Sequence, residues 1–205
     1  MHTIIIAPNR YIQGPGVLSQ IGDHIQHLGQ KAFFIGGPTA ISIVKDCATE
    51  NLKENNIQCQ LETFKGACTR AGAEGLSKKA KAFGADIIVG TGGGSVIDTA
   101  KAVSHELECN LVIAPTIASN DAPCSALSVQ YDENHMLDRF LILRRSPDVV
   151  LVDSRVIVQS PTRYFVAGMG DALATWFEAN TCTKSMAKNL PGGTSTAAAL
   201  SLARL

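Results

Sequence analysis

The sequence predicts an α/β fold: a Rossmann-like, mostly parallel sheet with helices on both faces, followed by the start of an all-helical domain. Short apolar runs alternate with helical patterns through residues 1–160, and this alternation is typical of βαβ units. Beyond that point only helical spacing remains. A chain of 205 residues, 45% hydrophobic and 18% charged, is long and apolar enough to form a sizeable core.

In the first half, apolar runs predict strands over residues 4–6, 31–35, 57–64 and 86–89. Apolar residues at helical spacing predict helices over residues 17–28, 39–55 and 71–83, the first closed by Gly29. The intervening residues 9–16 are polar and rich in glycine, which predicts a loop.

The second half begins with a helix that ends at Leu107 and a strand over residues 110–114. Further strands are expected over residues 127–131, 139–143 and 149–152, and Asp153 is suited to cap the segment after them. We place a domain boundary near Ser160, with one domain over residues 1–160 and the beginning of another over residues 161–205. A last helix is expected over residues 194–205.

The composition argues against several classes of partner. The formal net charge is 0 without a basic stripe, which argues against nucleic acid. No apolar run approaches the roughly 20 residues that cross a bilayer, so no membrane is expected, and the first residues do not resemble a signal peptide. The six cysteines show no CxxC pair, which favours reduced thiols and a cytoplasmic location.

The stretch from Gly90 to Lys101 joins a predicted strand to a predicted helix through three adjacent glycines. Glycines let backbone N–H groups approach an anion, and the helix directs its positive end to the same place, so this order suits a phosphate cradle. Ser95 is a candidate N-cap, whereas the reach of Lys101 does not follow from its spacing. The alternative is a tight turn without a ligand.

A second candidate segment is the polar loop, residues 115–128, which follows the next predicted strand. Its hydroxyl groups suit contacts with sugar and phosphate, and Asp121 is able to accept a hydrogen bond from an alcohol. Alternatively, Asp121 caps a turn.

Three stretches carry a resemblance to the iron-containing alcohol dehydrogenase family, and within it to the branch that acts on glycerol. They are the GGGSVIDTAK stretch at residues 92–101, residues 114–128 with PTIAS and DAPCSALS, and GDALATWFEA at residues 170–179. The resemblance covers the whole chain. It implies a dinucleotide-binding α/β domain and an all-helical domain, with the active site between them.

The resemblance also implies an oxidoreductase that transfers a hydride from glycerol to NAD and gives dihydroxyacetone. Asp121 would contact the polyol, and Asp171 would be a ligand of a divalent metal, zinc in this branch; no catalytic residue is implied beyond the metal site. From the residues alone, the preferred interpretation of Asp171 is a carboxylate near a helix N-terminus, favoured by the helix dipole. The residues implied to bind NAD are Gly37, Gly93, Gly94, Ser95, Val96, Ile97, Asp98, Thr116, Ile117, Ala118, Ser119, Ser125, Leu127 and Tyr131.

Three departures from the family pattern matter. Gly37 stands where the branch often has Asp, which leaves the choice between NAD and NADP open. Ser95 stands where Lys is common. The family completes its metal site with two later histidines, and none of the histidines here matches them: His2, His24, His27, His105 and His135.

We therefore expect a C-terminally truncated member of the family, inactive by itself, whose full-length form is a homo-oligomer. An apolar face around Met169 and Phe177 is expected to be partly uncovered. The alternatives are another polyol or hydroxycarboxylate dehydrogenase of the same family, and an NAD-binding fragment without catalysis.

Overall fold

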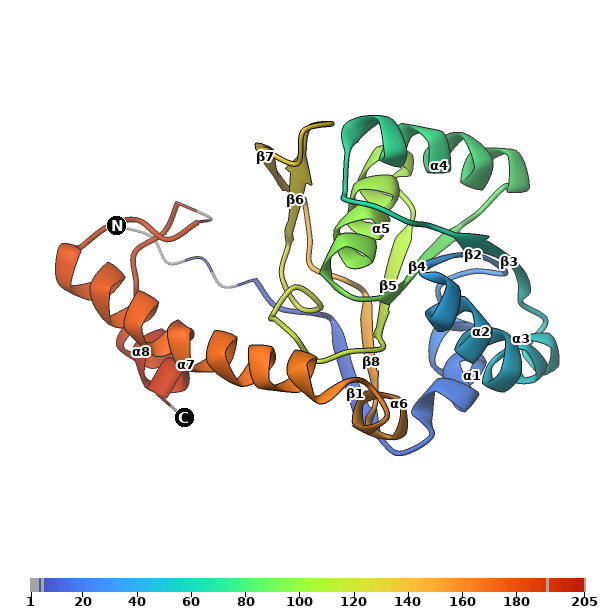
Figure 1. Cartoon of the computed structure of the whole chain (residues 1–205), viewed down its shortest axis with the longest axis horizontal. Coiled ribbons are helices and arrows are strands. Elements are labelled where there is room, and N and C mark those ends of the chain that lie inside the picture. Colours follow the sequence, from blue (N-terminus) through green and yellow to red (C-terminus); the bar gives the residue numbers. More distant parts are fainter. Residues whose placement is uncertain (1–3, 5, 191, 205) are drawn as a thin grey trace.

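In the computed structural model, which describes residues 4, 6–190 and 192–204, the centre of the chain is a parallel six-stranded sheet (Figure 1). The strand order is β1-β8-β5-β4-β2-β3, and each neighbouring pair is parallel. A separate antiparallel hairpin is formed by β6 and β7. The strands are β1 (Arg10–Gly14), β2 (Lys31–Gly36), β3 (Gln58–Thr63), β4 (Ile87–Gly92), β5 (Asn110–Pro115), β6 (Leu127–Tyr131), β7 (Leu137–Ile142) and β8 (Val149–Asp153).

Helices cover both faces of this sheet, as the sequence predicts (Figure 1). Alternate strand residues face opposite sides: Phe34 belongs to the core that includes residues of α1 and α2, whereas Phe33 packs with residues of α4 and α5. The helices are α1 (Ile21–Ile25), α2 (Pro38–Cys47), α3 (Thr49–Glu54), α4 (Arg70–Phe83), α5 (Gly94–Leu107), α6 (Ser154–Val158), α7 (Thr162–Ser185) and α8 (Ala197–Arg204), with a 3₁₀ turn at Val17–Gln20.

The packing of α5 on β4 depends on Gly90. A Cβ added at Gly90 would lie 2.7 Å from the Ala100 Cβ and 3.1 Å from the Ile113 Cδ1. Because no methyl group fits between strand and helix, Gly90 sets how closely α5 approaches the sheet.

The first strand differs from the prediction. Ile4 and Ile6 lie outside any strand, and Ile5 is outside the described residues. The expected loop over residues 9–16 instead contains β1, whose Arg10 pairs with Val149 and whose Gly14 pairs with Asp153. The sequence of this segment is too polar to predict a strand. It forms an edge strand because β8 supplies the hydrogen-bonding partners, and this contact exists only in the folded chain.

Two predicted helices are shorter than expected. The one over residues 17–28 is a 3₁₀ turn followed by α1, which ends at Ile25; after it, the Asp86 carboxylate accepts hydrogen bonds from the N–H groups of Gln30 and Lys31 at the start of β2. The helix expected over residues 39–55 is divided at Ala48 into α2 and α3. Next to this break the Thr49 hydroxyl donates to the Lys45 carbonyl, a bond that bends helices.

The end of the chain is only partly as expected. Asp153 caps α6, which the sequence did not predict, by accepting a hydrogen bond from the Arg155 N–H. The last helix begins at Ala197 and not at residue 194; Leu205 is outside the described residues.

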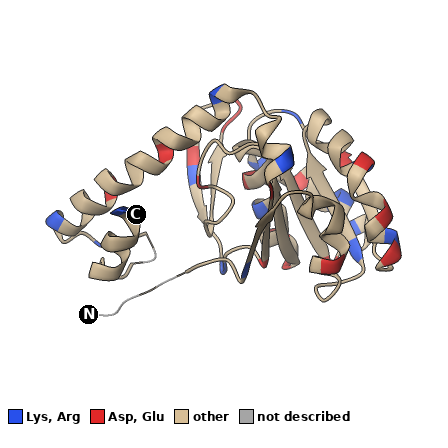
Figure 2. Cartoon of the chain, turned by 90° about the horizontal axis from the view of Figure 1, so that it is seen from below, with Lys and Arg blue, Asp and Glu red and all other residues tan. Residues whose placement is uncertain are grey.

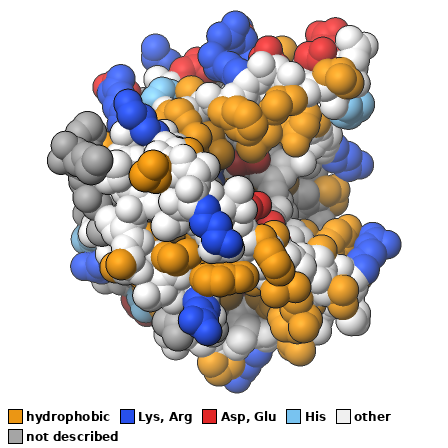
Figure 3. Space-filling model, turned by 90° about the vertical axis from the view of Figure 1, so that its left-hand side faces the viewer, with side chains coloured by type: hydrophobic (Ala, Val, Ile, Leu, Met, Phe, Trp, Pro, Cys, Tyr) orange, Lys and Arg blue, Asp and Glu red, His pale blue; other side chains and the backbone are white. Residues whose placement is uncertain are grey.

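Helix α7 extends away from the sheet, and α8 folds back against it (Figure 1). Hydrophobic side chains gather on the end of the molecule that carries these helices (Figure 3). The exposed large hydrophobic residues of α7 are Phe165, Val166, Met169, Leu173 and Phe177. The expected apolar face of this helix is therefore present in the structure.

Charged residues of both signs are interspersed along the helices in the view of Figure 2. Among residues 4, 6–190 and 192–204, no helix is long and apolar enough to cross a membrane.

Candidate functional site

The carboxyl ends of β2, β4 and β5 lie next to one another, because these strands are neighbours in the sheet. They lead into Gly37, Gly93 and Thr116, which are three of the residues predicted to bind the cofactor. The Thr116 N–H donates to the Gly92 carbonyl over 3.1 Å, so the polar loop starts beside the glycine turn. Ligands of parallel α/β sheets bind at this edge.

The N-terminus of α5 is open to an anion. Gly93 is the N-cap, no side chain caps it, and the first turn carries no acidic residue. The expectation that Ser95 is the N-cap is wrong, because Gly93 already has the extended backbone of a cap and Ser95 is the second residue of the helix, where it is exposed. The first N–H groups and the helix dipole are thus available to a phosphate.

The polar loop passes directly over this turn. A Cβ on Gly93 would lie 2.7 Å from the Ile117 Cδ1, and one on Gly94 would lie 3.0 Å from the Asn120 Nδ2. The glycines therefore let the side chains of the loop pack closely against the turn. Ala118 and Ser119, also predicted to bind the cofactor, are half-buried in the same loop.

The next three predicted residues face inward. Ile97 is buried in the core between α5 and the sheet, and Val96 packs against that core. Asp98 is also buried. Burial raises the pKa of Asp98 to about 6, against the opposing effect of the Lys101 ammonium, whose Nζ lies 4.0 Å from the Asp98 Oδ1.

Lys101 does not extend to the glycine turn but holds the polar loop. It is fully buried, and its Nζ donates to the Ala122 carbonyl (2.6 Å), the Ser125 Oγ (2.9 Å) and the Leu127 carbonyl (2.8 Å). An ammonium group has three N–H donors, and all of them are used. Burial lowers the pKa of Lys101 to about 8, although Asp98 acts in the opposite direction.

Strand β6 packs against α5. Leu127 is bound by Lys101, and the Ser128 hydroxyl donates to the Asp98 carbonyl, one turn nearer the start of the helix. At the end of the strand, the Tyr131 N–H donates to the Cys68 carbonyl over 2.8 Å, beside Thr69, the N-cap of α4. Leu127 and Tyr131 therefore flank the helix that carries the glycine turn.

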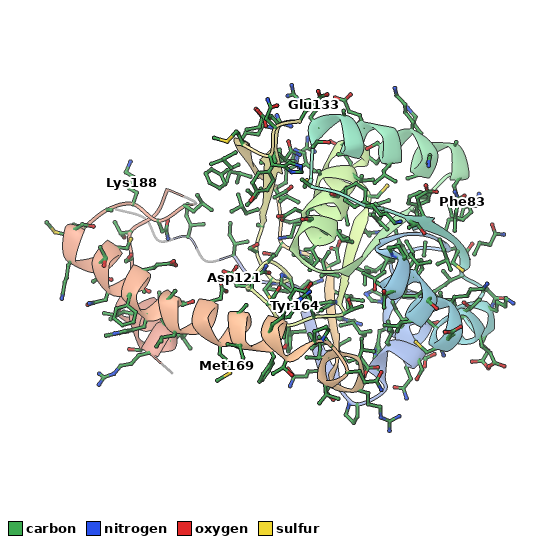
Figure 4. All side chains as sticks on the ribbon, viewed as in Figure 1. Phe83, Asp121, Glu133, Tyr164, Met169 and Lys188 are labelled. Carbon is green, nitrogen blue, oxygen red and sulfur yellow. The ribbon has the colours of Figure 1, made fainter. Side chains whose placement is uncertain are left out.

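Asp121 and Asp171 are brought together from different elements. The Asp121 N–H, in the polar loop, donates to the Asp171 Oδ2, on α7, over 3.0 Å. Figure 4 shows Asp121 beside α7 and Met169 on the opposite side of that helix. The two residues predicted to contact substrate and metal are thus neighbours.

The metal prediction finds no complete site. Within the described part of the chain, no group of three or more His, Cys, Asp and Glu side chains is placed to hold a metal ion. A catalytic metal ion such as zinc is usually held by three protein ligands, so the residues present do not fit such a centre by themselves.

A cavity of about 600 Å³ borders the polar loop at Ala118 and extends to Tyr11, Ile157 and Phe165. No other predicted site residue lines it. The sequence offers no signal for it, because its walls come from β1, β8, α6 and the start of α7, which meet only in the fold.

Together, the parallel sheet, the open helix N-terminus and the polar loop define an α/β protein with a candidate anion-binding site at the carboxyl edge of its sheet. The model of the iron-containing alcohol dehydrogenase family matches residues 8–154, and the chain belongs to that family. The family is one of oxidoreductases.

Relatives with assigned activities are similar over the whole chain. It is 39% identical over 205 residues to a glycerol dehydrogenase of Escherichia coli, and 42% identical over 212 residues to that of Thermotoga maritima. All of this chain but only 56% of each relative is covered, so the chain spans little more than half of their length.

A solved structure shows the same arrangement. The crystal structure of a probable glycerol dehydrogenase from Sinorhizobium meliloti superposes with a TM-score of 0.92 at 37% identity. The match covers 99% of this chain and 56% of that one.

Proposed function

We propose that this chain binds NAD in the cradle between α5 and the polar loop, and that the whole protein oxidises glycerol to dihydroxyacetone. The observation that carries the proposal is the α5 N-terminus, which has no side-chain cap and no acidic residue in its first turn. The polar loop lies close to it, because Gly93 and Gly94 have no side chains. The similarity to glycerol dehydrogenases supports the choice of substrate.

In this proposal the N–H groups at Gly94 and Ser95 hold the pyrophosphate, and the polar loop closes over it. Bound NAD supplies the acceptor for a hydride. The exposed Asp121 carboxylate orients a hydroxyl group of the polyol by accepting its hydrogen bond.

We further propose that residues 1–160 form the dinucleotide-binding domain and residues 161–205 the start of the metal and substrate domain. A divalent metal, zinc by resemblance to the glycerol branch although the family is named for iron, would need ligands besides Asp171. The chain alone is accordingly proposed to be inactive on glycerol. Six free cysteines support a cytoplasmic location.

Calorimetric titration of the 205-residue chain with NAD, and then with zinc, tests these proposals. We expect NAD to bind and zinc not to bind as one tight ion. Zinc binding at one ion per chain, or turnover of glycerol that a chelator abolishes, would contradict the incomplete metal site.

A paired variant locates the NAD site. Gly94→Asp adds a carboxylate to the first turn of α5 and is expected to weaken NAD binding at least tenfold by repulsion. Gly75→Asp adds the same charge on α4, where a Cβ meets nothing within 4 Å, and should leave NAD binding unchanged. Equal effects of the two variants would place the nucleotide elsewhere.

A further inference from the structure

Helix α7 meets the polar loop at a glycine that is not part of the predicted site. A Cβ added at Gly168 would lie 2.2 Å from the Ala118 carbonyl oxygen, 3.0 Å from its carbon and 3.4 Å from the Ser119 Cα. These atoms are backbone, so no side-chain rotation relieves the overlap. The helix therefore rests directly on the main chain of the loop.

The same face of α7 carries Asp171. Residues three apart in a helix lie on one side, so Gly168 and Asp171 are both directed at the polar loop. The Gly168 contact brings the helix close enough for the Asp171 Oδ2 to accept the Asp121 N–H at 3.0 Å. Gly170, two residues further along α7, has no atom within 4 Å of its added Cβ.

We propose that Gly168 is a positioning residue, whose missing side chain sets the distance between the Asp171 carboxylate and the Asp121 segment of the polar loop. The importance of this distance for catalysis rests on the proposed function, in which Asp121 contacts the polyol and Asp171 a metal. The effect of Gly168 on the distance does not, because it follows from the contact geometry alone.

The backbone N–H signal of Asp121 in ¹H–¹⁵N spectra of the 205-residue chain tests the proposal. Asp171→Ala removes the acceptor and defines the signal and the hydrogen-exchange rate of an unbonded Asp121 N–H. We expect Gly168→Ala to shift the signal in the same direction and to accelerate exchange at least tenfold, because the helix must move off the loop. Gly170→Ala, on the same helix, should leave both unchanged.

A wild-type Asp121 signal in Gly168→Ala, or an equal change in Gly170→Ala, would overturn the proposal. The amide signals of β4 and β5 report whether each variant is folded. Should Gly168→Ala not fold, the unaltered chain decides: a nuclear Overhauser effect between the α-protons of Gly168 and Ser119 is required, and its absence refutes the contact.

Binding of NAD separates this inference from the proposed function. If the unaltered chain fails to bind NAD, the proposed function fails, while the Asp121 signal still decides the role of Gly168. If NAD binds and Gly168→Ala leaves the Asp121 signal unchanged, only the role of Gly168 is lost.

Discussion

The Lys101 Nζ lies 2.8 Å from the Leu127 carbonyl oxygen, and this bond joins the helix of the glycine turn to the first residue of β6. With the bonds to Ala122 and Ser125, it makes a buried ammonium group the main polar link between α5 and the end of the polar loop. The shape of the cradle therefore depends on a residue that need not touch the cofactor.

Lys101→Met is expected to lower the free energy of unfolding by about 3 kcal/mol, because three acceptors lose their donor and Asp98 loses its partner. NAD should bind about tenfold more weakly, since the loop is no longer held. Urea unfolding and calorimetry measure the two effects. Lys79→Met is the control, because Lys79 forms an exposed pair with Glu62 and its loss should cost less than about 1 kcal/mol.

Asp98 predicts a pH dependence of stability. Its pKa is raised to about 6 in the folded chain from an ordinary value of 3.8, so the native state holds more protons between these values. The stabilisation due to Asp98 is complete below the ordinary pKa and is lost as the pH rises through 6, by about 1–3 kcal/mol. Urea midpoints of the unaltered chain should show this loss relative to Asp98→Asn; parallel pH profiles would contradict it.

Gly37→Asp is expected to favour NAD over NADP by about tenfold, because a carboxylate at this site accepts from the ribose hydroxyls and repels a 2′-phosphate. The site has room, since a Cβ at Gly37 meets nothing within 4 Å. Titrations with both cofactors measure the ratio, and Gly75→Asp serves as the charge control. An unchanged ratio would show that the adenosine ribose does not lie beside the N-terminus of α2.

Gly90→Ala should destabilise the chain by about 1–3 kcal/mol, because its methyl group would overlap the Ala100 side chain. Gly75→Ala, in an open position within α4, should instead stabilise it by about 0.5–1 kcal/mol. Thermal unfolding of both variants measures the two changes in stability, which should have opposite signs.

Most of the α/β architecture was predictable because its signals are local. The buried strands β2, β4 and β5 are continuous apolar runs, and α4 carries both its cap, Thr69, and its terminating Gly84. The sequence does not predict the first strand, because the polar residues Arg10 and Gln13 become a strand only beside β8. No window of sequence contains both partners.

The arrangement of the glycine turn and the polar loop was also partly predictable from the sequence. Glycine spacing indicates the turn at Gly93, and the structure places the polar loop beside it. The contacts of Lys101 do not follow from its spacing, although a lysine on the buried face of a helix, with Ile97 and Ser104, is itself a signal of an internal role. No sequence signal indicates the role of Gly168, because the atom that excludes a side chain there is the carbonyl oxygen of Ala118, which is distant in the sequence.

The pairing of β1 with β8 has a kinetic consequence. Arg10 finds its partner only at Val149, and the Asp153 carboxylate then accepts the N–H groups of Gly16 and Leu18. During synthesis, β1 emerges before the other strands of this sheet but is the last of them to be incorporated, while β2, β4 and β5 can already assemble around shorter loops. Until β8 arrives, the β5 edge of the sheet stays open, and protection of the β1 amides should appear as the final step of refolding.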